Sequence, residues 1–443
     1  MNGHSVASAS LQDAFAAALA RARQQPPPGG WFDVCAPCPQ GPLGLLANAA
    51  ALGAPYVFRL SSDRRRALLG VGQLLRVRRA GPDRLAAVAE AARAARAPWL
   101  LGLFSFDAAG SPRPFAPADF IVPQLLVEEQ DGRRSVRLIG RVDDPGGAPS
   151  LWQALLARHA PPHPAGRVRF VEAPGSRVRW QREVSLAVRA IRAGELEKVV
   201  LARSALAVAD GAFDAAAVAA ALARTEQHAT VFAVHRGHRT FVGATPELLV
   251  RVEGRQAEVD CLAGSAPRGA TAAEDAVLGQ ALLGSAKNRR EHDFVVTGVL
   301  AALRAAGATP VADAGPGLLR LPSVQHLLTP VRATLAEGVG PLEIAGFLHP
   351  TPAMGGTPPA AAQAWIARHE RPPRGLFAGG VGYVRGEEGT FDVAIRCALL
   401  DGRRGRLWAG CGIVADSDPA EELRESHLKL RPMRRALREA GTP

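Results

Sequence analysis

Lysine is scarce in this chain of 443 amino acids. Lysine and arginine together number 53, but only three of them are lysine: Lys198, Lys287 and Lys429. The other 50 (53 − 3) are arginine. Arginine does not lose its proton in a protein, whereas a shielded lysine can become a free amine and act as a base. The three lysines are therefore the first places to look for chemistry.

The chain also lacks long apolar runs and paired cysteines. No stretch of about 18 apolar residues predicts a transmembrane helix, and the N-terminus lacks the basic start and apolar core of a secretory signal. The five cysteines are an odd and scattered set, which favours a reducing compartment. Cys35 and Cys38 form a C-x-x-C with no second pair or histidine cluster, so a chance spacing is favoured over zinc or redox chemistry. We expect a cytoplasmic protein that binds no membrane.

Long blocks of one charge sign are missing as well. The formal net charge is +12, which by itself suggests a polyanionic partner. The arginines are interleaved with acidic residues, however, and the densest runs, 64–66 and 403–404, are short. Aromatic residues do not alternate with them as in single-strand nucleic-acid binders. No nucleic-acid partner is expected, and the charge suits a small anionic substrate.

The apolar pattern that is present predicts an α+β fold. Turn signals and alternating apolar residues predict strand pairs at 120–129 with 134–141, 230–234 with 240–244, and 248–252 with 257–262. A strand at 198–207, a three-strand meander at 376–384, 391–400 and 407–414, and helices at 10–23, 180–194, 213–224, 272–306 and 419–440 complete the prediction. Hairpins outnumber βαβ units, which argues against a doubly wound parallel sheet. Pro/Gly-rich segments at 144–150 and 161–166 mark a boundary or a surface loop.

Common nucleotide-binding and hydrolase motifs are absent. No G-x-G-x-x-G, P-loop or G-x-S-x-G stands in a usable context. Lys198 instead begins a strongly apolar strand, where a buried amine could serve as a base; a strand-edge lysine with its head in water is the alternative. Glu247 follows a strand beside apolar residues, and such a carboxyl group can hold its proton and act as an acid.

The last predicted helix carries a possible metal site. Glu422, Glu425 and Lys429 fall on one stripe of the helix, and two carboxylates three residues apart can converge on Mg²⁺. A solvated, salt-bridged face is the alternative. Lys287 lies four residues before Glu291 on the long helix, where a surface ion pair is again the simpler interpretation.

Several segments resemble the chorismate-utilising enzymes, in that family's order, over about residues 178–440. The segments are 197–203 (EKVVLAR), 243–249 (GATPELL), 262–266 (LAGSA), 285–295 (SAKNRREHDFV), 324–330 (VQHLLTP), 348–356 (LHPTPAMGG), 376–382 (LFAGGVG), 394–398 (AIRCA) and 409–429 (AGCGIVADSDPAEELRESHLK). Among these enzymes the isochorismate synthases are the most similar. The implied fold is that of anthranilate synthase component I, with two orthogonally packed antiparallel β-sheets between helices. Residues 1–150 match poorly and are expected to belong to the same large unit as a catalytic region at 178–440.

The resemblance also implies residue roles. Lys198 matches a general base that activates water for attack at C2 of chorismate, and Glu247 matches the acid that protonates the departing C4 hydroxyl. Glu291 and Glu425 match carboxylates that hold Mg²⁺, and Glu422 is a further candidate ligand. The matched substrate-binding residues are Gly264, Ser265, His326, Arg396, Gly410, Gly412 and Lys429.

The nucleophile separates members of this family. Aminating relatives, which deliver ammonia, usually carry Gln where this chain has Lys198, so water is the expected nucleophile and no glutamine amidotransferase subunit is expected. Salicylate synthases keep the lysine and go on to eliminate pyruvate; they tend to have Tyr, Leu and Gln at the positions of Phe377, Ile395 and Trp408. The apolar set here favours an isomerase that stops at isochorismate, with a salicylate synthase as the alternative. A monomer is expected, and menaquinone, siderophore and salicylate pathways all stay open.

Overall fold

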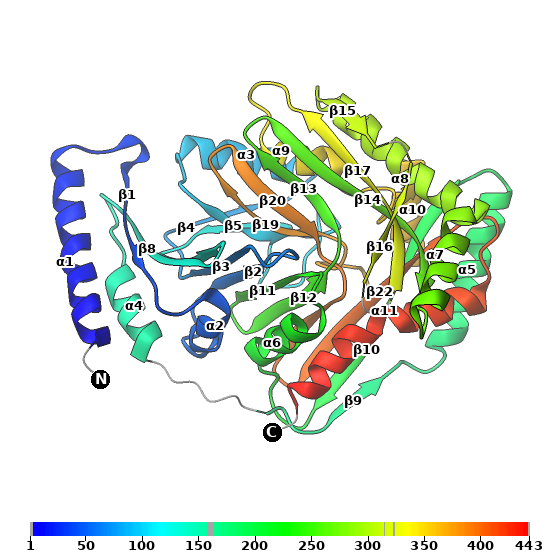
Figure 1. The fold of residues 1–443 in the computed structure, drawn as a ribbon, viewed down its shortest axis with the longest axis horizontal. Helices are drawn as coiled ribbons and strands as arrows, with labels where there is room; N and C mark the ends of the chain where they lie inside the picture. Colours follow the sequence, from blue (N-terminus) through cyan, green and yellow to red (C-terminus); the bar gives the residue numbers. More distant parts are fainter. Residues whose placement is uncertain (1–2, 158–163, 314, 322–323, 442–443) are drawn as a thin grey trace.

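The chain forms two antiparallel β-sheets with helices packed against them (Figure 1). This computed structural model describes residues 3–157, 164–313, 315–321 and 324–441. Each recorded strand pairing is antiparallel. The predicted α+β class, with antiparallel sheets built from hairpins, is therefore confirmed.

The first sheet, called sheet A, runs through both halves of the chain. Its strands, in spatial order, are β1 (Trp31–Pro37), β8 (Arg133–Arg141), β7 (Leu125–Gln130), β3 (Arg66–Val71), β2 (Tyr56–Leu60), β11 (Thr230–Arg236), β12 (Arg239–Thr245), β21 (Cys397–Asp401), β22 (Arg404–Ile413), β10 (Lys198–Ala209) and β18 (Gly356–Thr357). A further strand, β9 (Val168–Val171), also pairs with β10. The N-terminal strands thus continue directly into the sheet that carries Lys198.

The second sheet, sheet B, is built in the same way. Its strands, in spatial order, are β15 (Thr309–Ala312), β17 (Val324–Thr334), β14 (Gln256–Pro267), β13 (Leu248–Glu253), β20 (Glu388–Val393), β19 (Gly380–Arg385), β5 (Leu100–Phe104), β6 (Ala118–Val122) and β4 (Leu75–Arg79). A short strand, β16 (Gly317–Arg320), pairs with β17. Residues before 150 therefore contribute strands to both sheets.

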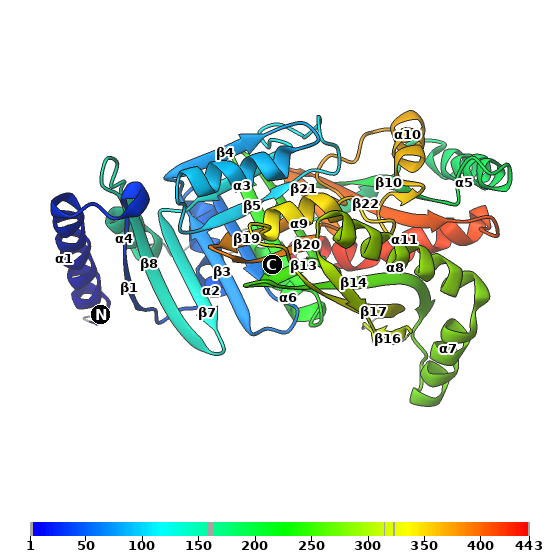
Figure 2. The same cartoon turned by 90° about the horizontal axis from the view of Figure 1, so that it is seen from above.

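Helices cover each sheet (Figures 1 and 2). Those in contact with sheet A are α1 (Gly3–Gln24), α2 (Pro42–Ala51), α4 (Ala148–Ala157), α5 (Ser176–Arg192), α6 (Ala215–Thr225), α10 (Pro359–His369) and α11 (Pro419–Glu439). Those in contact with sheet B are α3 (Arg84–Ala94), α7 (Ala272–Gly284), α8 (Ala286–Ala305) and α9 (Pro341–Leu348). Figure 2 shows α1 and α4 at one end of the molecule and α7 projecting at the other. None of the helices in the described part of the chain is long and apolar enough to cross a bilayer.

Several predicted elements are correct, and their local signals explain them. The hairpins β11–β12 and β13–β14 form where alternation predicts them. Helix α11 begins at the predicted cap, where Asp418 Oδ1 accepts hydrogen bonds from the backbone of Ala420 and Glu421. This cap satisfies two of the amide groups that a helix start leaves free.

Three predicted elements are wrong, because each of them is interrupted. The strand expected at 120–129 divides at Pro123, since β6 ends in sheet B and β7 begins in sheet A. The strand expected at 391–400 divides around Arg396, which has a left-handed φ of 51°. The helix expected at 272–306 divides at Ser285, whose hydroxyl accepts from the Asn288 amide and caps α8. Part of the connector expected at 161–166 lies outside the described residues.

The interruptions at 123 and 396 let one chain supply both sheets. The same change of sheet occurs between β12 and β13, across Pro246 and Glu247. One large core lies between the two sheets and another lies between sheet A and its helices. Residues at these crossings, where the chain passes from one sheet to the other, are therefore held between packed elements of both sheets.

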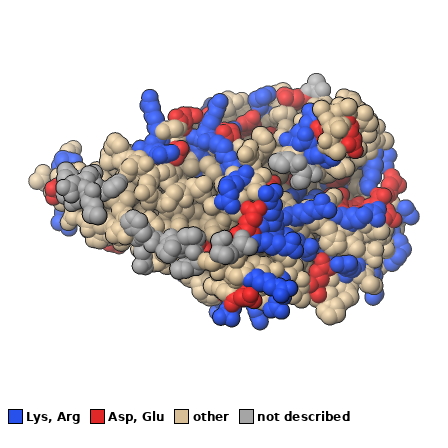
Figure 3. All heavy atoms as spheres, turned by 60° about the horizontal axis from the view of Figure 1, so that its bottom comes forward, with Lys and Arg blue, Asp and Glu red and all other residues tan. Residues whose placement is uncertain are grey.

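Positive charge gathers on one face of the molecule (Figure 3). One local cluster of positive charge is paired: Glu172 forms ion pairs with Arg177, Arg203 and Arg434. The three guanidinium groups, with hydrogen bonds from Arg177 and Arg434, outweigh burial and lower the pKa of Glu172 to about 2. This carboxylate therefore stays charged and ties the segment before α5 to β10 and α11.

Candidate active site

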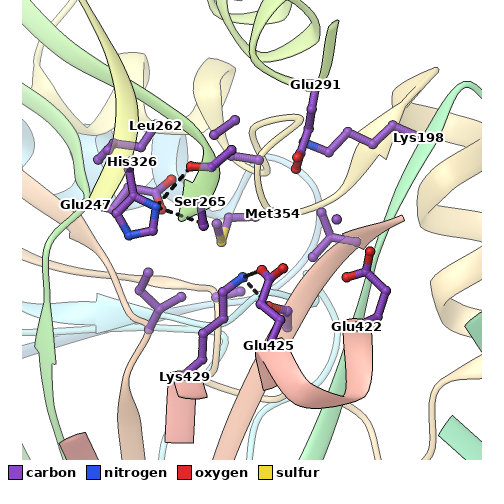
Figure 4. A pocket seen from close by; sticks show the side chains of 18 of the residues that line it. Lys198, Glu247, Leu262, Ser265, Glu291, His326, Met354, Glu422, Glu425 and Lys429 are labelled. Carbon is purple, nitrogen blue, oxygen red and sulfur yellow. Dashed lines mark hydrogen bonds and ion pairs between the residues drawn. The ribbon is translucent and has the colours of Figure 1, made fainter. Parts of the chain in front are cut away.

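A pocket of about 370 Å³ lies where α8 and α11 meet the ends of strands from both sheets (Figure 4). All twelve residues that the sequence suggests for catalysis, metal binding and substrate binding line it: Lys198, Glu247, Gly264, Ser265, Glu291, His326, Arg396, Gly410, Gly412, Glu422, Glu425 and Lys429. These residues come from segments that are up to about 230 positions apart (429 − 198 = 231). The tertiary fold, and not their spacing along the sequence, brings these residues together in one cavity.

Lys198 is buried at the start of β10 and faces a carboxylate. Its side chain is 1% exposed, and Nζ lies 3.1 Å from Glu291 Oε1 on α8. The helical spacing predicts Lys287 as a partner of Glu291, but Lys287 Nζ instead lies 3.8 Å from Glu422 Oε1. The lysine in the strand is therefore neither at a strand edge nor in water.

Helix α11 presents three charged side chains on one stripe. Lys429 Nζ lies 2.6 Å from Glu425 Oε1 and donates a hydrogen bond of 2.9 Å to the Gly410 carbonyl. Burial alone would raise the pKa of Glu425, but the charge and hydrogen bond of Lys429 outweigh burial and lower it. Burial raises the pKa of Glu422 to about 7, and the neighbouring Glu425 charge adds to the shift. Of these two carboxyl groups, Glu425 is therefore readily ionised, whereas Glu422 resists ionisation.

Glu247 enters the pocket from the opposite side to Lys198, as Figure 4 shows. It stands at the crossing between β12 and β13, and its backbone carbonyl accepts a 3.0 Å hydrogen bond from Val393 N. Burial raises the pKa of Glu247 to about 7, against the opposing charges of Arg396, Lys198 and Lys429. A carboxyl group in this state holds a proton near neutral pH and can donate it.

His326 is a neutral hydrogen-bonding group in this pocket. Burial lowers the pKa of His326 to about 3, and the charges of Arg396 and Lys429 lower it further. Its Nδ1 lies 3.2 Å from the Gly264 carbonyl and 2.9 Å from Ser265 Oγ. A carbonyl oxygen can only accept, so Nδ1 carries the hydrogen and Nε2 is left as an acceptor. The neutral ring fixes one wall of the pocket without adding charge.

Glycine is required where β22 and β14 approach the charged groups. A Cβ at Gly412 would overlap the Glu291 carboxylate and lie 3.0 Å from Lys198 Cε. Gly264 has a φ of +75° at a register shift in β14, a conformation that favours glycine. Small residues at these positions let the backbone form pocket walls.

One buried residue of the pocket, Arg374, carries no signal that sequence patterns reveal. It is 1% exposed and pairs with Glu370 at 2.6 Å. It also donates hydrogen bonds to the carbonyls of Met354 (2.6 Å) and Val200 (2.5 Å). It lies in a Pro-Pro-Arg-Gly loop, and its partners are up to 174 residues away, so spacing could not reveal it. Arg374 joins β10 to two loops beside the site.

The acidic residues form a donor set that fits a divalent cation. Side-chain ligand atoms of Cys411, Glu422 and Glu425 lie within 4.8 Å of one another. Glu291 faces the same cavity from α8. Carboxylate oxygens are the ligands that Mg²⁺ prefers, and a nearby cation would favour the ionised form of Glu422 against burial and the Glu425 charge, which raise its pKa. The buried thiol of Cys411 is a poorer match for this metal.

The chain matches the family model described as chorismate binding enzyme over residues 17–438, and it belongs to that family. The salicylate biosynthesis isochorismate synthase of Pseudomonas aeruginosa is 42% identical over 361 residues, covering 78% of this chain and 75% of that protein. The isochorismate synthase MenF of Bacillus subtilis is 35% identical over 351 residues, covering 77% and 74%.

Solved structures agree with this assignment. The menaquinone-specific isochorismate synthase MenF from Escherichia coli matches with a TM-score of 0.79 at 26% identity, over 92% of this chain and 95% of that one. Anthranilate synthase component I from Streptococcus pneumoniae matches with a TM-score of 0.70 at 18% identity, over 83% and 92%. The anthranilate synthase component I-like fold predicted from the sequence is confirmed.

Proposed function

We propose that this protein is an isochorismate synthase that converts chorismate to isochorismate with the help of Mg²⁺. The observation that carries the proposal is the opposition of a buried lysine, Lys198, and a buried carboxylic acid, Glu247, across one pocket. The isomerisation needs a proton taken from water on one side of the ring and a proton given to the leaving hydroxyl on the other. The names of the relatives that match more than three quarters of the chain support the same reaction.

In this proposal the chain's own residues handle both protons. Lys198 Nζ removes a proton from a water molecule as that water attacks C2 of the ring. Glu247 gives its proton to the C4 hydroxyl, which leaves as water. Each step matches the group: a shielded amine is a usable base, and a carboxyl group with a pKa of about 7 is a usable acid.

Cationic side chains on one side of the pocket would pair with the negative charge of the substrate. Chorismate carries two carboxylates, and Arg396 and Lys429 are half-buried cations of the pocket lining, placed to pair with one of them. Glu291, Glu425 and Glu422 would hold Mg²⁺, which would neutralise the other carboxylate and orient the ring. His326 Nε2, left as an acceptor, can receive a hydrogen bond from a substrate hydroxyl.

The salicylate synthase alternative depends on residues beside the ring. Phe377 and Ile395 line the pocket, whereas Trp408 does not line it and lies behind Phe377. Two apolar side chains at this wall offer no group to assist loss of pyruvate. Isochorismate is therefore the expected end product.

Product analysis tests the proposal directly. The protein is incubated with chorismate and Mg²⁺, and the products are separated by chromatography. Isochorismate as the main product, with loss of turnover after chelation and recovery with added Mg²⁺, is expected. Salicylate and pyruvate without an added lyase would assign the alternative, and turnover that survives chelation would remove Mg²⁺ from the proposal.

A binding measurement tests the metal ligands apart from turnover. Titration calorimetry with Mg²⁺ is expected to show about 10- to 100-fold weaker binding for Glu425→Gln. Glu439→Gln, at the far end of the same helix, is the matched control and should bind as wild type does. Equal binding by both variants would exclude Glu425 as a ligand.

A further inference from the structure

A second cavity, of about 630 Å³, adjoins the active pocket on the face of sheet A. It is lined by strand residues Leu206, Arg239, Leu399, Asp401, Arg404, Arg406 and Trp408 and by two loops, 107–112 and 372–375. Its volume is within the usual range for small-molecule sites. Nothing in the proposed reaction uses it.

The two cavities lie along one strip of the same sheet face. Side chains alternate between faces along a strand, and Arg404, Arg406 and Trp408 of β22 line the second cavity, whereas Gly410 and Gly412 line the active pocket. The partners of Arg406 in the neighbouring strands are Leu206 and Leu399, which lie in the same cavity. The second cavity is therefore a continuation of the floor of the active site.

A thin partition separates the two cavities. The rings of Phe377 and Trp408 are stacked, with centroids 6.3 Å apart and planes at 8°. Phe377 lines the active pocket and Trp408 lines the second cavity, while Arg374 lines both. A ligand on one side of this wall would touch residues that shape the other side.

The charged groups of the second cavity leave two arginines unpaired. Arg239 is paired with Asp401 at 2.8 Å, and Arg374 is paired with Glu370 at 2.6 Å. Among the described residues, neither Arg404 nor Arg406 forms an ion pair; Arg406 donates only a 3.3 Å hydrogen bond to Ser204. Asp107, which also lines the cavity, carries one opposing carboxyl group, so the cavity keeps a net positive charge of at least one beside these two arginines.

The walls between these charges are largely apolar. Three proline rings (Pro112, Pro372 and Pro373), two leucines and the indole of Trp408 make up much of the lining. An inorganic anion would leave this surface uncovered, whereas a planar ring would cover it. Guanidinium groups both pair with carboxylates and stack on aromatic faces. We propose that the second cavity binds a small aromatic carboxylate, with its acid group on Arg404 and Arg406, and that its occupancy modulates the active site through Phe377 and Arg374.

Binding is tested without chorismate or Mg²⁺, so the result does not depend on the proposed reaction. Benzoate and salicylate are titrated into the full chain by calorimetry and by saturation-transfer NMR. The Arg404→Ala/Arg406→Ala double variant is expected to bind at least about tenfold more weakly, since charge-assisted hydrogen bonds are lost. Arg403→Ala, the preceding arginine outside the cavity lining, is the matched control and should bind as wild type does.

Three results would overturn the proposal. No binding at millimolar benzoate would remove the site, and equal binding by the double variant would place the ligand elsewhere. Acetate binding as tightly as benzoate would show a simple anion site instead of an aromatic one.

The coupling is tested by kinetics, and this part rests on the proposed function. Benzoate is expected to lower kcat for chorismate with little change in KM, and the double variant is expected to turn over normally but lose this inhibition. Purely competitive inhibition that persists in the double variant would put benzoate in the active pocket. If chorismate is not a substrate, the calorimetric result still decides whether the site exists.

Discussion

At the scale of single residues, the three lysines of the chain share one arrangement. Lys198, Lys287 and Lys429 all line the active pocket, from β10, α8 and α11, and each faces a glutamate: Glu291, Glu422 and Glu425, respectively. A cation that engages Glu425 would leave the Lys429 ammonium group free for a substrate carboxylate. The scarcity of lysine thus pointed to the site, although it did not indicate the pairing.

Lys198 is the lysine for which arginine should fail. Replacing it by arginine keeps the charge but removes a side chain that can become a free amine. We expect Lys198→Arg to lower kcat by about 10²- to 10⁴-fold, the usual contribution of general-base catalysis. Lys287→Arg is the control, because its partly exposed pair with Glu422 needs only charge. Near-normal turnover of Lys198→Arg would show that Lys198 is not the base.

The raised pKa of Glu247 predicts that kcat falls as pH rises. Its pKa in the folded protein, about 7, is raised from 4.5, so the acid form needed for catalysis is lost as pH rises through 7. With substrate saturating, kcat should fall about tenfold for each pH unit on the alkaline side.

The free energy of unfolding should also fall as pH rises. A raised pKa means that ionisation of Glu247 costs folding free energy, so its contribution is full below pH 4.5 and is lost as pH rises through about 7. Glu247→Gln should remove both trends while keeping the fold at pH 5. An alkaline fall in kcat that is identical in Glu247→Gln, measured on residual activity, would assign the titration to another group.

At the scale of elements, the sequence predicted what local periodicity can encode. The cap and stripe of α11 and the hairpins β11–β12 and β13–β14 follow from spacing alone. The points where the chain changes from one sheet to the other do not follow from spacing, because an apolar strand shows the same sequence pattern in either sheet. Pro123 and Arg396 interrupt runs that look continuous, and the second of these interruptions places a site residue. The candidate residues could be named from a family resemblance, but only the fold brings them together.

Strand β22 offers a comparison between two of its glycines. Gly410 and Gly412 lie on the same face, but a Cβ at Gly410 would find its nearest neighbour at 3.3 Å, whereas one at Gly412 would overlap Glu291. We expect Gly412→Ala to lose at least about 100-fold in kcat/KM, since shifts of about 1 Å near a site have effects of this size. Gly410→Ala should lose much less, and circular dichroism should show both variants folded. Equal losses would show that the close approach of Gly412 to Glu291 does not make this position more sensitive than Gly410.

At the scale of the whole molecule, buried ion pairs join the two sheets. Arg59 Nε of β2 donates a 2.7 Å hydrogen bond to Asp392 of β20, which also accepts from Thr230 of β11 at 3.1 Å. Arg236 of β11 pairs in the same way with Asp119 of β6, at 3.2 Å. Burial alone would lower the pKa of Arg59, but the charge of Asp392 outweighs burial and raises it. The partners are separated by 333 and 117 residues, so no sequence pattern could predict them.

Asp392 is the group whose loss should weaken the joint between the sheets most clearly. Asp392→Ala leaves the Arg59 guanidinium buried without its counter-charge, and breaking a buried pair in this way costs about 3–5 kcal/mol of unfolding free energy. Arg59→Met/Asp392→Leu removes both charges and should recover most of the loss, because the desolvation cost disappears with the pair. Asp401→Ala, which breaks the half-exposed pair with Arg239, is the control and should cost under about 1 kcal/mol. Urea unfolding followed by tryptophan fluorescence measures the unfolding free energy of all three variants. A stability loss no larger than that of Asp401→Ala would show that the Arg59–Asp392 pair does not stabilise the joint between the sheets.

The same substitution should also affect catalysis. Because Val393 N, next to Asp392, donates a hydrogen bond to the Glu247 carbonyl, Asp392→Ala should lower kcat more than Asp401→Ala does.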